Sequence, residues 1–362
     1  MQQPQRILVI QPSWVGDAVM ATPALRALRE RFPEAHIAYL CRRYVKPIYA
    51  GLPYADRILT YRTGQSRSKT GKGTFDVARR IRKGKFDTAI LLSNSFKSAL
   101  LCKLAGIKRI VGYERDGRGF LLSDRLLPYK EKGKYIPSPI LYYYLAIVQY
   151  LGSRERNIHM ELRVTPAQQE HAQQVLTRCG LDAALEKPFA RGQGPLVILN
   201  AGAQFGASKC WLPEHFAAVA DRLIESHNAT ILLSGTPRER RIIDAIQRQM
   251  HHAAVDLTSK GLTLGSLKEI IRRCDLMITN DTGPRHIAAA FDVPVITIFG
   301  PTHPQWTEIY FPRERQVTAK VFCGPCQKKV CPLDHRCMKQ VTPDMVCDAS
   351  MQLLQNPTPV LA

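Results

Sequence analysis

Two strand–turn–helix segments, one near each end of this 362-residue chain, constrain its fold most strongly. The first passes from an apolar run at residues 7–10 through the turn 12–17, which holds Asp17, into a helical pattern. The second passes from residues 276–279 through the turn 280–286, which holds Asp281. In open α/β sheets, ligands bind at the carboxyl ends of the strands. The pattern therefore predicts one such unit, with a carboxylate at its ligand-binding edge, in each half of the chain.

Strand-like and helix-like runs alternate through both halves of the chain. We expect strands at residues 6–10, 35–40, 88–92, 109–112, 196–200, 230–234, 276–279 and 295–299. We expect helices at residues 18–31, 75–83, 96–105, 213–226, 238–250, 266–274 and 285–291. Alternation of this kind implies βαβ units and mainly parallel sheets. The predicted fold class is α/β, with two doubly wound Rossmann-like domains.

A stretch rich in proline, glycine and charge at residues 186–195 is the best linker candidate, since Pro and Gly end periodic segments. The predicted domains are therefore 1–185 and 196–362, the second with a Cys-rich segment at 323–347. The apolar residues 140–148 predict a packed helix, and a helix lying in a membrane interface is the alternative.

The net charge of +21 is concentrated in the first half of the chain. Residues 1–185 hold 31 Lys and Arg against 14 Asp and Glu, a net charge of +17, whereas residues 186–362 hold 20 against 16, a net of +4. An uneven distribution of charge indicates which partners a protein binds and does not determine its fold. It predicts that the first half meets a large anionic partner: a phosphorylated lipid, a membrane surface or a nucleic acid.

The sequence also excludes several classes of protein. No apolar run approaches the roughly 18 residues that span a bilayer, and the N-terminus lacks the apolar core of a signal peptide, so we expect a cytoplasmic protein. No G-x-G-x-x-G motif follows the first strand, and residues 70–74 lack the first glycine of a Walker loop. A Rossmann dehydrogenase and a P-loop kinase are both disfavoured.

Four strings in the same chain resemble one enzyme family. They are PSWVGD at 12–17, NSFKSAL at 94–100, GAQFG at 202–206 followed by Lys209, and NDTG at 280–283 with His286. Together they are similar to the ADP-heptose:lipopolysaccharide heptosyltransferases of glycosyltransferase family 9, and the first two are most similar to heptosyltransferase II. The resemblance implies a GT-B fold, with two domains facing a central cleft, and inverting transfer of heptose from ADP-heptose to the lipopolysaccharide inner core. It also implies that no metal is required for catalysis.

The resemblance assigns a catalytic base and an acceptor side to the first domain. Inverting transfer needs a base that takes the acceptor hydroxyl proton, and the base of the family aligns with Asp17. The alternative is that Asp17 only caps a helix. Trp14 and Lys97 lie in the matching strings and are implied acceptor contacts.

The donor side is implied for the second domain. Lys209 matches the lysine that contacts the diphosphate and stabilises charge on the leaving group, so it counts as both catalytic and donor-binding. Glu239 matches the carboxylate that holds the ribose hydroxyls, although an acid favoured by the helix dipole is the alternative. Asp281, Thr282 and Gly283 match residues that contact donor phosphate and sugar. For His286, donor contact and a purely structural role are both open.

A basic run follows residue 61 and contains a single acid, Asp76. It consists of Arg62, Arg67, Lys69, Lys72, Arg79, Arg80, Arg82, Lys83 and Lys85. Runs of this kind are usually solvated. Here the basic run suggests a surface that steers the phosphorylated lipid A–core acceptor, with Arg79, Arg80 and Arg82 as acceptor contacts. Alternatively, the run docks on the anionic inner leaflet of the membrane. We therefore expect a cytoplasmic protein peripheral to the inner membrane.

Four cysteines follow the last predicted strand with the spacing C-x2-C-x4-C-x5-C. They are Cys323, Cys326, Cys331 and Cys337, with His335 nearby. Four thiolates within such a span are able to close around one tetrahedral Zn²⁺. The second C-x-x-C pair of a strong zinc signature is absent, so free or redox-paired thiols remain the alternative to a structural zinc.

Two further functions stay open from the sequence. In the first, the chain belongs to the same family but acts on another nucleotide sugar or another acceptor. The identity of the donor is poorly encoded in the sequence, since Gln204 stands where the family pattern leads us to expect Glu. A non-enzymatic module for anionic lipid or nucleic acid would explain the charge, but it leaves Asp17, Lys209, Glu239 and Asp281 without roles. No basic strand with interleaved aromatic residues is present, so we expect no nucleic-acid partner.

Overall fold

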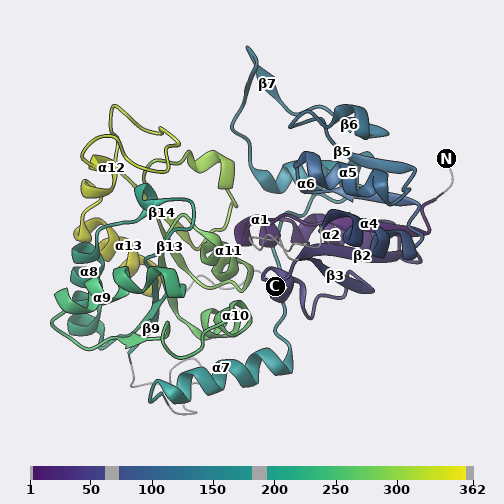
Figure 1. Cartoon of the computed structure of the whole chain (residues 1–362). Helices are drawn as coiled ribbons and strands as arrows, with labels where there is room; N and C mark the ends of the chain where they lie inside the picture. The colour runs from purple at the N-terminus through teal and green to yellow at the C-terminus, as the bar shows by residue number, and fades with distance from the viewer. Residues whose placement is uncertain (1–2, 62–72, 182–193, 356–362) are drawn as a thin grey trace. The chain divides into compact units, whose positions relative to one another are not determined.

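A computed structural model describes residues 3–61, 73–181 and 194–355. Its contacts divide the chain into two compact units (Figure 1). The N-terminal unit runs to Arg163 and includes the short segment Gln305–Ile309, and the C-terminal unit holds the rest.

The N-terminal unit is built on a six-stranded sheet with the order β3-β2-β1-β4-β5-β6. All five pairings in this sheet are parallel. Its strands are β1 (Arg6–Ile10), β2 (His36–Arg42), β3 (Arg57–Tyr61), β4 (Thr88–Leu91), β5 (Arg109–Tyr113) and β6 (Asp124–Leu126). Its helices are α1 (Val15–Met20), α2 (Thr22–Arg31), α3 (Lys46–Tyr49), α4 (Thr74–Lys83), α5 (Phe96–Leu104), η1 (Gly119–Leu121) and α6 (Ile140–Tyr150). A separate two-stranded hairpin joins β7 (Lys130–Glu131) and β8 (Lys134–Tyr135).

The C-terminal unit repeats this topology in the order β11-β10-β9-β12-β13-β14, again with every pairing parallel. Its strands are β9 (Leu196–Asn200), β10 (Thr230–Ser234), β11 (Val255–Asp256), β12 (Leu276–Asn280), β13 (Val295–Phe299) and β14 (Glu314–Thr318). Its helices are α7 (Pro166–Arg178), α8 (Pro213–His227), α9 (Arg240–Gln249), α10 (Leu264–Arg273), α11 (Gly283–Ala290), α12 (Arg336–Lys339) and α13 (Pro343–Gln355). Short 3-10 turns of this unit are η3 (Ala207–Lys209) and η4 (Pro237–Glu239), whereas η5 (Pro304–Thr307) lies mostly in the segment that belongs to the N-terminal unit.

The central strands are apolar because helices cover both faces of each sheet. Residues 7–10 of β1 and all five residues of β9 are buried. Parallel sheets buried on both sides require such continuous apolar runs. In the N-terminal unit one face packs on α4 and α5, and in the C-terminal unit one face packs on α8, α9 and α13.

The helix expected at residues 18–31 is two helices in the structure. α1 ends at Met20 and α2 begins at Thr22, with Pro23 in its first turn. Proline has no N–H to donate to the carbonyl four residues earlier. The Thr22 hydroxyl donates to that Val19 carbonyl instead, at 2.8 Å, so the break is stabilised locally.

The boundary between the units lies earlier than the expected residue 185. It falls between Arg163 and Val164 because α7 packs against α10 of the C-terminal unit. His171 of α7 contacts the Thr263 hydroxyl at 3.2 Å, and Arg273 donates to Gln173 at 3.2 Å. Most of the expected linker at 186–195 falls outside the described residues.

The apolar stretch before residue 152 forms the packed helix that the sequence predicts. α6 buries Leu141, Tyr144, Leu145, Ile147 and Val148 and packs against α2. Among the described residues, no helix has the length and apolar character needed to cross a membrane.

Candidate active site

The predicted site residues gather where each sheet reverses its strand order. In the N-terminal unit Asp17 follows β1 and Asn94 follows β4, which are neighbouring strands. In the C-terminal unit Lys209 follows β9 and Asp281 follows β12, which are also neighbours. Ligands of doubly wound proteins bind at this switch point, outside the carboxyl ends of the strands. Both units therefore present polar side chains at the expected place.

Asp17 lies in the first turn of α1 and is partly buried. The N-cap residue of this helix is Trp14, which is 51% exposed and makes no side-chain capping bond. Asp17 therefore does not occupy the cap position that the structural alternative gave it. Its carboxylate carries a negative charge into the positive end of the helix.

Three tyrosines respond to the negative charge of Asp17. Burial raises the pKa of Tyr44, Tyr49 and Tyr144, and the charge of Asp17 raises each pKa further. All three phenols are therefore protonated near neutral pH. Within the described residues, the buried Tyr49 hydroxyl has no hydrogen-bond partner.

The turn after β4 is held by two residues that the sequence analysis missed. The Asn94 Oδ1 accepts hydrogen bonds from Arg118 Nη2 at 3.1 Å and from the Tyr143 hydroxyl at 2.9 Å. Arg118 is fully buried and also donates to the Ser93 carbonyl. These partners lie 24 and 49 residues from Asn94, so no local motif could reveal them. They fix the turn that presents Lys97, which is exposed in the first turn of α5.

In the C-terminal unit Lys209 and Asp281 form a buried ion pair. Lys209 Nζ lies 2.5 Å from Asp281 Oδ2, and the two side chains are 11% and 5% exposed. The Thr302 hydroxyl donates to the same carboxylate oxygen at 2.9 Å, and Arg285 Nη1 lies 3.4 Å from Oδ1. The sequence assigned Lys209 and Asp281 separately to a donor. The structure shows that they are direct partners.

Arg285 extends this charge network to the last strand. It is fully buried and donates to Glu314 of β14 through Nε at 2.5 Å and Nη2 at 2.8 Å. The Thr297 hydroxyl donates to the same glutamate at 2.5 Å. The sequence analysis missed Arg285 and Glu314, although Arg285 lies within the quoted turn 280–286. Such fully paired charges tolerate burial that an isolated charge would not.

The network fixes the protonation of two predicted residues. Burial alone would raise the pKa of Asp281, but Lys209 and Arg285 outweigh it and hold the pKa at about 2. Burial lowers the pKa of His286 to about 3, and Arg285 adds to the effect. His286 is therefore neutral near pH 7 and brings no positive charge to the site. Only 2% of its surface is exposed, and its Nδ1 has no partner among the described residues.

The amide side chains of the two asparagines that end β9 and β12 form hydrogen bonds with the loop that follows the neighbouring strand. Asn280 accepts from the Trp211 backbone at 3.0 Å and donates to the Ala201 carbonyl at 2.7 Å. Asn200 donates to the hydroxyl of Thr282, the N-cap residue of α11, at 3.2 Å. Gly283 is the first residue of that helix. The start of α11 and the loop after β9 are therefore held in one arrangement.

Glu239 lies close to the loop after β9. Its Oε2 accepts from the backbone and the hydroxyl of Thr236, at 2.7 and 2.8 Å, which completes a capping box. The carboxyl group fills the space beside Gly202, where an added Cβ would lie 2.0 Å from Glu239 Cδ. The structure thus shows the helix-terminal role of this side chain, and its ribose contact stays a prediction.

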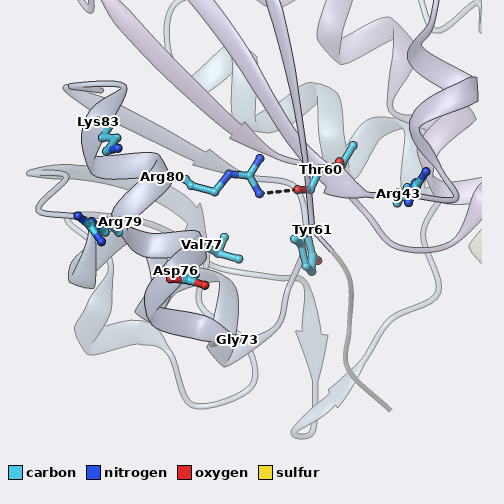
Figure 2. A pocket seen from close by; sticks show the side chains of 9 residues that line it. All are labelled: Arg43, Thr60, Tyr61, Gly73, Asp76, Val77, Arg79, Arg80 and Lys83. Carbon is cyan, nitrogen blue, oxygen red and sulfur yellow. Dashed lines mark hydrogen bonds between the residues drawn. The ribbon is translucent and has the colours of Figure 1, made fainter. Parts of the chain in front are cut away.

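A cavity of about 630 Å³ lies beside α4 in the N-terminal unit (Figure 2). Four cations and one acid line it: Arg43, Arg79, Arg80, Lys83 and Asp76. Figure 2 shows Arg80 reaching from α4 toward the end of β3, where it donates to the Thr60 carbonyl at 3.0 Å.

The third predicted arginine of α4 does not line this cavity. Arg82 donates to the Leu104 carbonyl at 2.6 Å and so points toward the end of α5. Arg82 is therefore separated from Arg79 and Lys83 by the direction of its side chain. Arg62, Arg67, Lys69 and Lys72 of the same basic run lie outside the described residues.

The family model of glycosyltransferase family 9, the heptosyltransferases, matches residues 74–336. The chain belongs to this family. Over 83% of its length it is 30% identical to lipooligosaccharide heptosyltransferase 2 of Haemophilus influenzae, of which the match covers 85%. It is therefore an enzyme, a glycosyltransferase of the heptosyltransferase family.

Solved structures of the same family share the fold. A family 9 glycosyltransferase of Veillonella parvula superposes with a TM-score of 0.81 at 22% identity, covering 97% of both chains. ADP-heptose lipopolysaccharide heptosyltransferase II of Escherichia coli superposes with a TM-score of 0.78 at 24% identity, covering 97% of this chain and 99% of that one. The predicted GT-B architecture, with two Rossmann-like domains, is confirmed.

The four predicted metal-ligand cysteines of this heptosyltransferase line one cavity of about 220 Å³. Within the described ranges, however, no three His, Cys, Asp or Glu side chains are arranged to hold a metal ion. The side chains as they stand therefore do not form a metal site, and structural zinc stays a prediction.

The Cys-rich segment instead contacts the turn that carries Lys209. The Ser208 hydroxyl donates to the Lys328 carbonyl at 2.6 Å, and the Ser208 N–H donates to the Lys329 carbonyl at 3.2 Å. His335 Nε2 lies 2.8 Å from the Ser208 carbonyl. Gly206 packs so closely on Lys329 that an added Cβ would lie 2.3 Å from its carbonyl oxygen. This segment thus supports the turn that positions Lys209.

Proposed function

We propose that this heptosyltransferase moves heptose from ADP-heptose to the inner core of a lipid A–core acceptor, with inversion at the anomeric carbon. The observation that carries the proposal is the chemistry at the two switch points: a carboxylate in the N-terminal unit, and a lysine–carboxylate pair beside a helix N-terminus in the C-terminal unit. The similarity to lipooligosaccharide heptosyltransferase 2 supports these substrates.

Asp17 is the base of the proposed reaction. It takes the proton of the acceptor hydroxyl while that oxygen forms a bond to the anomeric carbon of the heptose. The bond from this carbon to the diphosphate oxygen breaks with its electron pair, and ADP leaves. Attack from the face opposite the leaving group inverts the anomeric centre. A positioned base of this kind contributes roughly 10²–10⁴-fold to a rate.

The C-terminal unit receives the donor. Negative charge grows on the diphosphate as ADP leaves, and Lys209 together with the N-terminal amides of α11 stabilises it. Asp281 holds the lysine in place at 2.5 Å, and Thr282 and Gly283 begin the helix. Glu239 accepts the ribose hydroxyls. His286 is buried and neutral, so we assign it to packing around this site.

The cavity beside α4 receives phosphate groups of the acceptor. Its lining carries four cations against one acid, in the half of the chain whose net charge is +17. The acceptor is anchored in a membrane, so the enzyme works as a peripheral protein on the cytoplasmic face of the inner membrane.

The direct test is transfer by the purified protein from ADP-heptose to a heptose-bearing core lipid, read by mass spectrometry. We expect the acceptor to gain the mass of one heptose and ADP to appear in equal amount. Transfer from a different nucleotide sugar, with none from ADP-heptose, would refute the donor assignment and leave the family membership intact.

The contact between Gly202 and Glu239 gives a test of the donor site. Glu239→Ala and Gly202→Ala should each raise KM for ADP-heptose by roughly tenfold to a hundredfold, since hydrogen bonds to a charged group contribute about 1.5–3 kcal/mol. The kcat should change little, because ribose is held equally in the ground and transition states. In Gly202→Ala the new Cβ displaces only the end of a flexible side chain, so the fold should survive, with a stability loss no larger than that of one helix cap, about 0.5–2 kcal/mol.

Gly235→Ala is the matched control for this donor test. Its added Cβ would lie 3.5 Å from Glu239 Cβ, an ordinary contact that displaces nothing. Isothermal titration with ADP should show weak binding by Gly202→Ala and normal binding by Gly235→Ala. Normal ADP binding by both Glu239→Ala and Gly202→Ala would place the ribose elsewhere.

The basic cavity gives a test of the acceptor site. Changing Arg79, Arg80 and Lys83 together to Gln should raise KM for the lipid acceptor about tenfold at low salt, since exposed ion pairs contribute about 0.2–1 kcal/mol each. The KM for ADP-heptose should not change. Because exposed charges are screened within about 8 Å at physiological salt, the effect should shrink as salt rises.

Arg82→Gln is the control for this acceptor test, because Arg82 lies on the same helix but contacts the Leu104 carbonyl. It should keep the wild-type KM for the acceptor at every salt concentration. An equal loss in Arg82→Gln would mean that only the overall charge of α4 matters. No loss in the triple variant would leave the cavity without a role in acceptor binding.

A further inference from the structure

The β7–β8 hairpin projects from the N-terminal unit outside its six-stranded sheet (Figure 1). Lys130 pairs with Tyr135 and Glu131 with Lys134 across the antiparallel strands. The two residues between the strands, Lys132 and Gly133, have φ values of 47° and 78°, as the tight two-residue turn of a hairpin requires. A hairpin of this size has little stability of its own in water.

The base of the hairpin carries apolar side chains that are uncovered. Leu127 is 76% exposed, Tyr129 81% and Ile136 38%. The Ile136 N–H donates to the Tyr129 carbonyl at 3.2 Å, so these residues are cross-strand neighbours. Leu127 lies two residues before Tyr129 in the chain. Three large apolar side chains are therefore exposed at the base of the hairpin.

The face of the hairpin opposite Tyr129 and Ile136 is occupied. The guanidinium of Arg115 lies 4.0 Å from the centre of the Tyr135 ring, and the Lys130 ammonium lies 4.8 Å from it. The hairpin is thus held to the body of the unit by its Tyr135 side. The apolar side stays turned outward.

Lysines lie beside these apolar side chains. Lys134 and Glu131 share the face of Tyr129 and Ile136 nearer the turn, Lys132 lies in the turn, and Lys130 lies on the opposite face. All three lysines are exposed, and the hairpin carries a net charge of +2. Apolar and aromatic side chains flanked by lysines match the boundary between the acyl chains and the anionic headgroups of a bilayer. Two copies of the hairpin would instead bring like charges together, which disfavours self-association through this face.

We propose that this hairpin docks the enzyme on an anionic lipid bilayer, with Leu127, Tyr129 and Ile136 entering the headgroup–acyl boundary and the lysines contacting lipid phosphates. The inference rests on the proposed function, in which the acceptor is itself anchored in such a bilayer. It assigns membrane contact to a surface separate from the basic cavity beside α4.

Vesicle flotation of the full chain tests the proposal. Wild-type protein should float with vesicles of phosphatidylethanolamine and phosphatidylglycerol and bind poorly to phosphatidylcholine vesicles. Changing Leu127 and Tyr129 together to Ser should weaken binding to the anionic vesicles about tenfold or more. Changing Lys130, Lys132 and Lys134 to Gln should remove the preference for the anionic lipid. Phe322→Ser, which alters an 81% exposed side chain of the C-terminal unit, should float as wild type does.

Kinetics separate this proposal from the proposed function. On a deacylated, water-soluble acceptor, the Leu127/Tyr129 double Ser variant should keep the wild-type kcat and KM. On acceptor embedded in vesicles, its KM should rise about tenfold. Wild-type protein that transfers no heptose to either acceptor would refute the proposed function, while flotation would still report on the hairpin.

Three results would overturn the membrane assignment. They are flotation of the double Ser variant equal to wild type, no flotation of wild type with anionic vesicles, and a dimer of wild type that the double Ser variant loses in size-exclusion chromatography with light scattering. The last result would show that the apolar face contacts a second copy of the chain.

Discussion

Asp17→Asn should lower kcat by roughly 10²–10⁴-fold, the usual contribution of a positioned general base. The amide has the size of the carboxylate but does not accept a proton at neutral pH. The fold should survive, because Asp17 is not the N-cap residue of α1 and Asn keeps the size of its side chain, while the interaction of the carboxylate with the helix dipole contributes about 0.3–1 kcal/mol. Steady-state kinetics with ADP-heptose and core acceptor, beside thermal melting, would measure both effects.

Two controls accompany Asp17→Asn. ADP affinity should equal that of wild type, because the residues that we propose for the donor lie in the C-terminal unit. Asp116→Asn makes the same chemical change at an exposed position with φ 53°, a conformation that Asn accepts easily, and should keep full activity. Near-normal turnover by Asp17→Asn would remove this carboxylate from the mechanism.

The sequence predicted the central strands of both sheets and missed their edges. β1, β9, β10 and β13 match the expected ranges residue for residue, because apolar neighbours cover both sides of such strands. The edge strands β3 and β14 escaped notice. In β14, Glu314 is only 9% exposed, since Arg285 from 29 residues away neutralises it, and no local pattern reveals such a partner.

The sequence indicated which candidate site residues follow the strands, but it did not show which of these residues contact one another. Asp17, Lys209 and Asp281 lie at the switch points because each follows a strand that the sequence identified. The pairing of Lys209 with Asp281, 72 residues apart, needed the parallel alignment of β9 with β12. Arg82 was grouped with Arg79 and Arg80 because sequence proximity does not show to which side of a helix a residue points.

The buried pair makes the Lys209→Met variant the sharpest test of the donor site. The kcat should fall roughly 10²–10³-fold, as it does when one group that stabilises a developing anion is removed. The variant should also lose on the order of 3 kcal/mol of stability, because Asp281 keeps its buried charge without its closest partner. Urea unfolding monitored by circular dichroism, beside single-turnover kinetics, would separate the two losses.

The pH dependence of stability reports on the same pair. The pKa of Asp281 is about 2, below its ordinary value of 3.8, so the carboxylate contributes stability that is complete above about pH 4 and lost as the pH falls toward 2. A shift of this size corresponds to about 2 kcal/mol. In Lys209→Met the pKa should rise, and this acid-sensitive contribution should shrink.

The double variant Lys209→Met/Asp281→Asn decides whether the lysine acts on the donor or only on its partner. Replacing both charges removes the unpaired carboxylate, so most of the lost stability should return. Activity should stay low, because the Lys209 cation is gone and Arg285 stays paired with Glu314. Asp281→Asn alone keeps the Lys209 cation and should retain more activity than the double variant. If activity returned together with stability in the double variant, Lys209 would be a structural residue, and the charge on the leaving group would need another stabiliser.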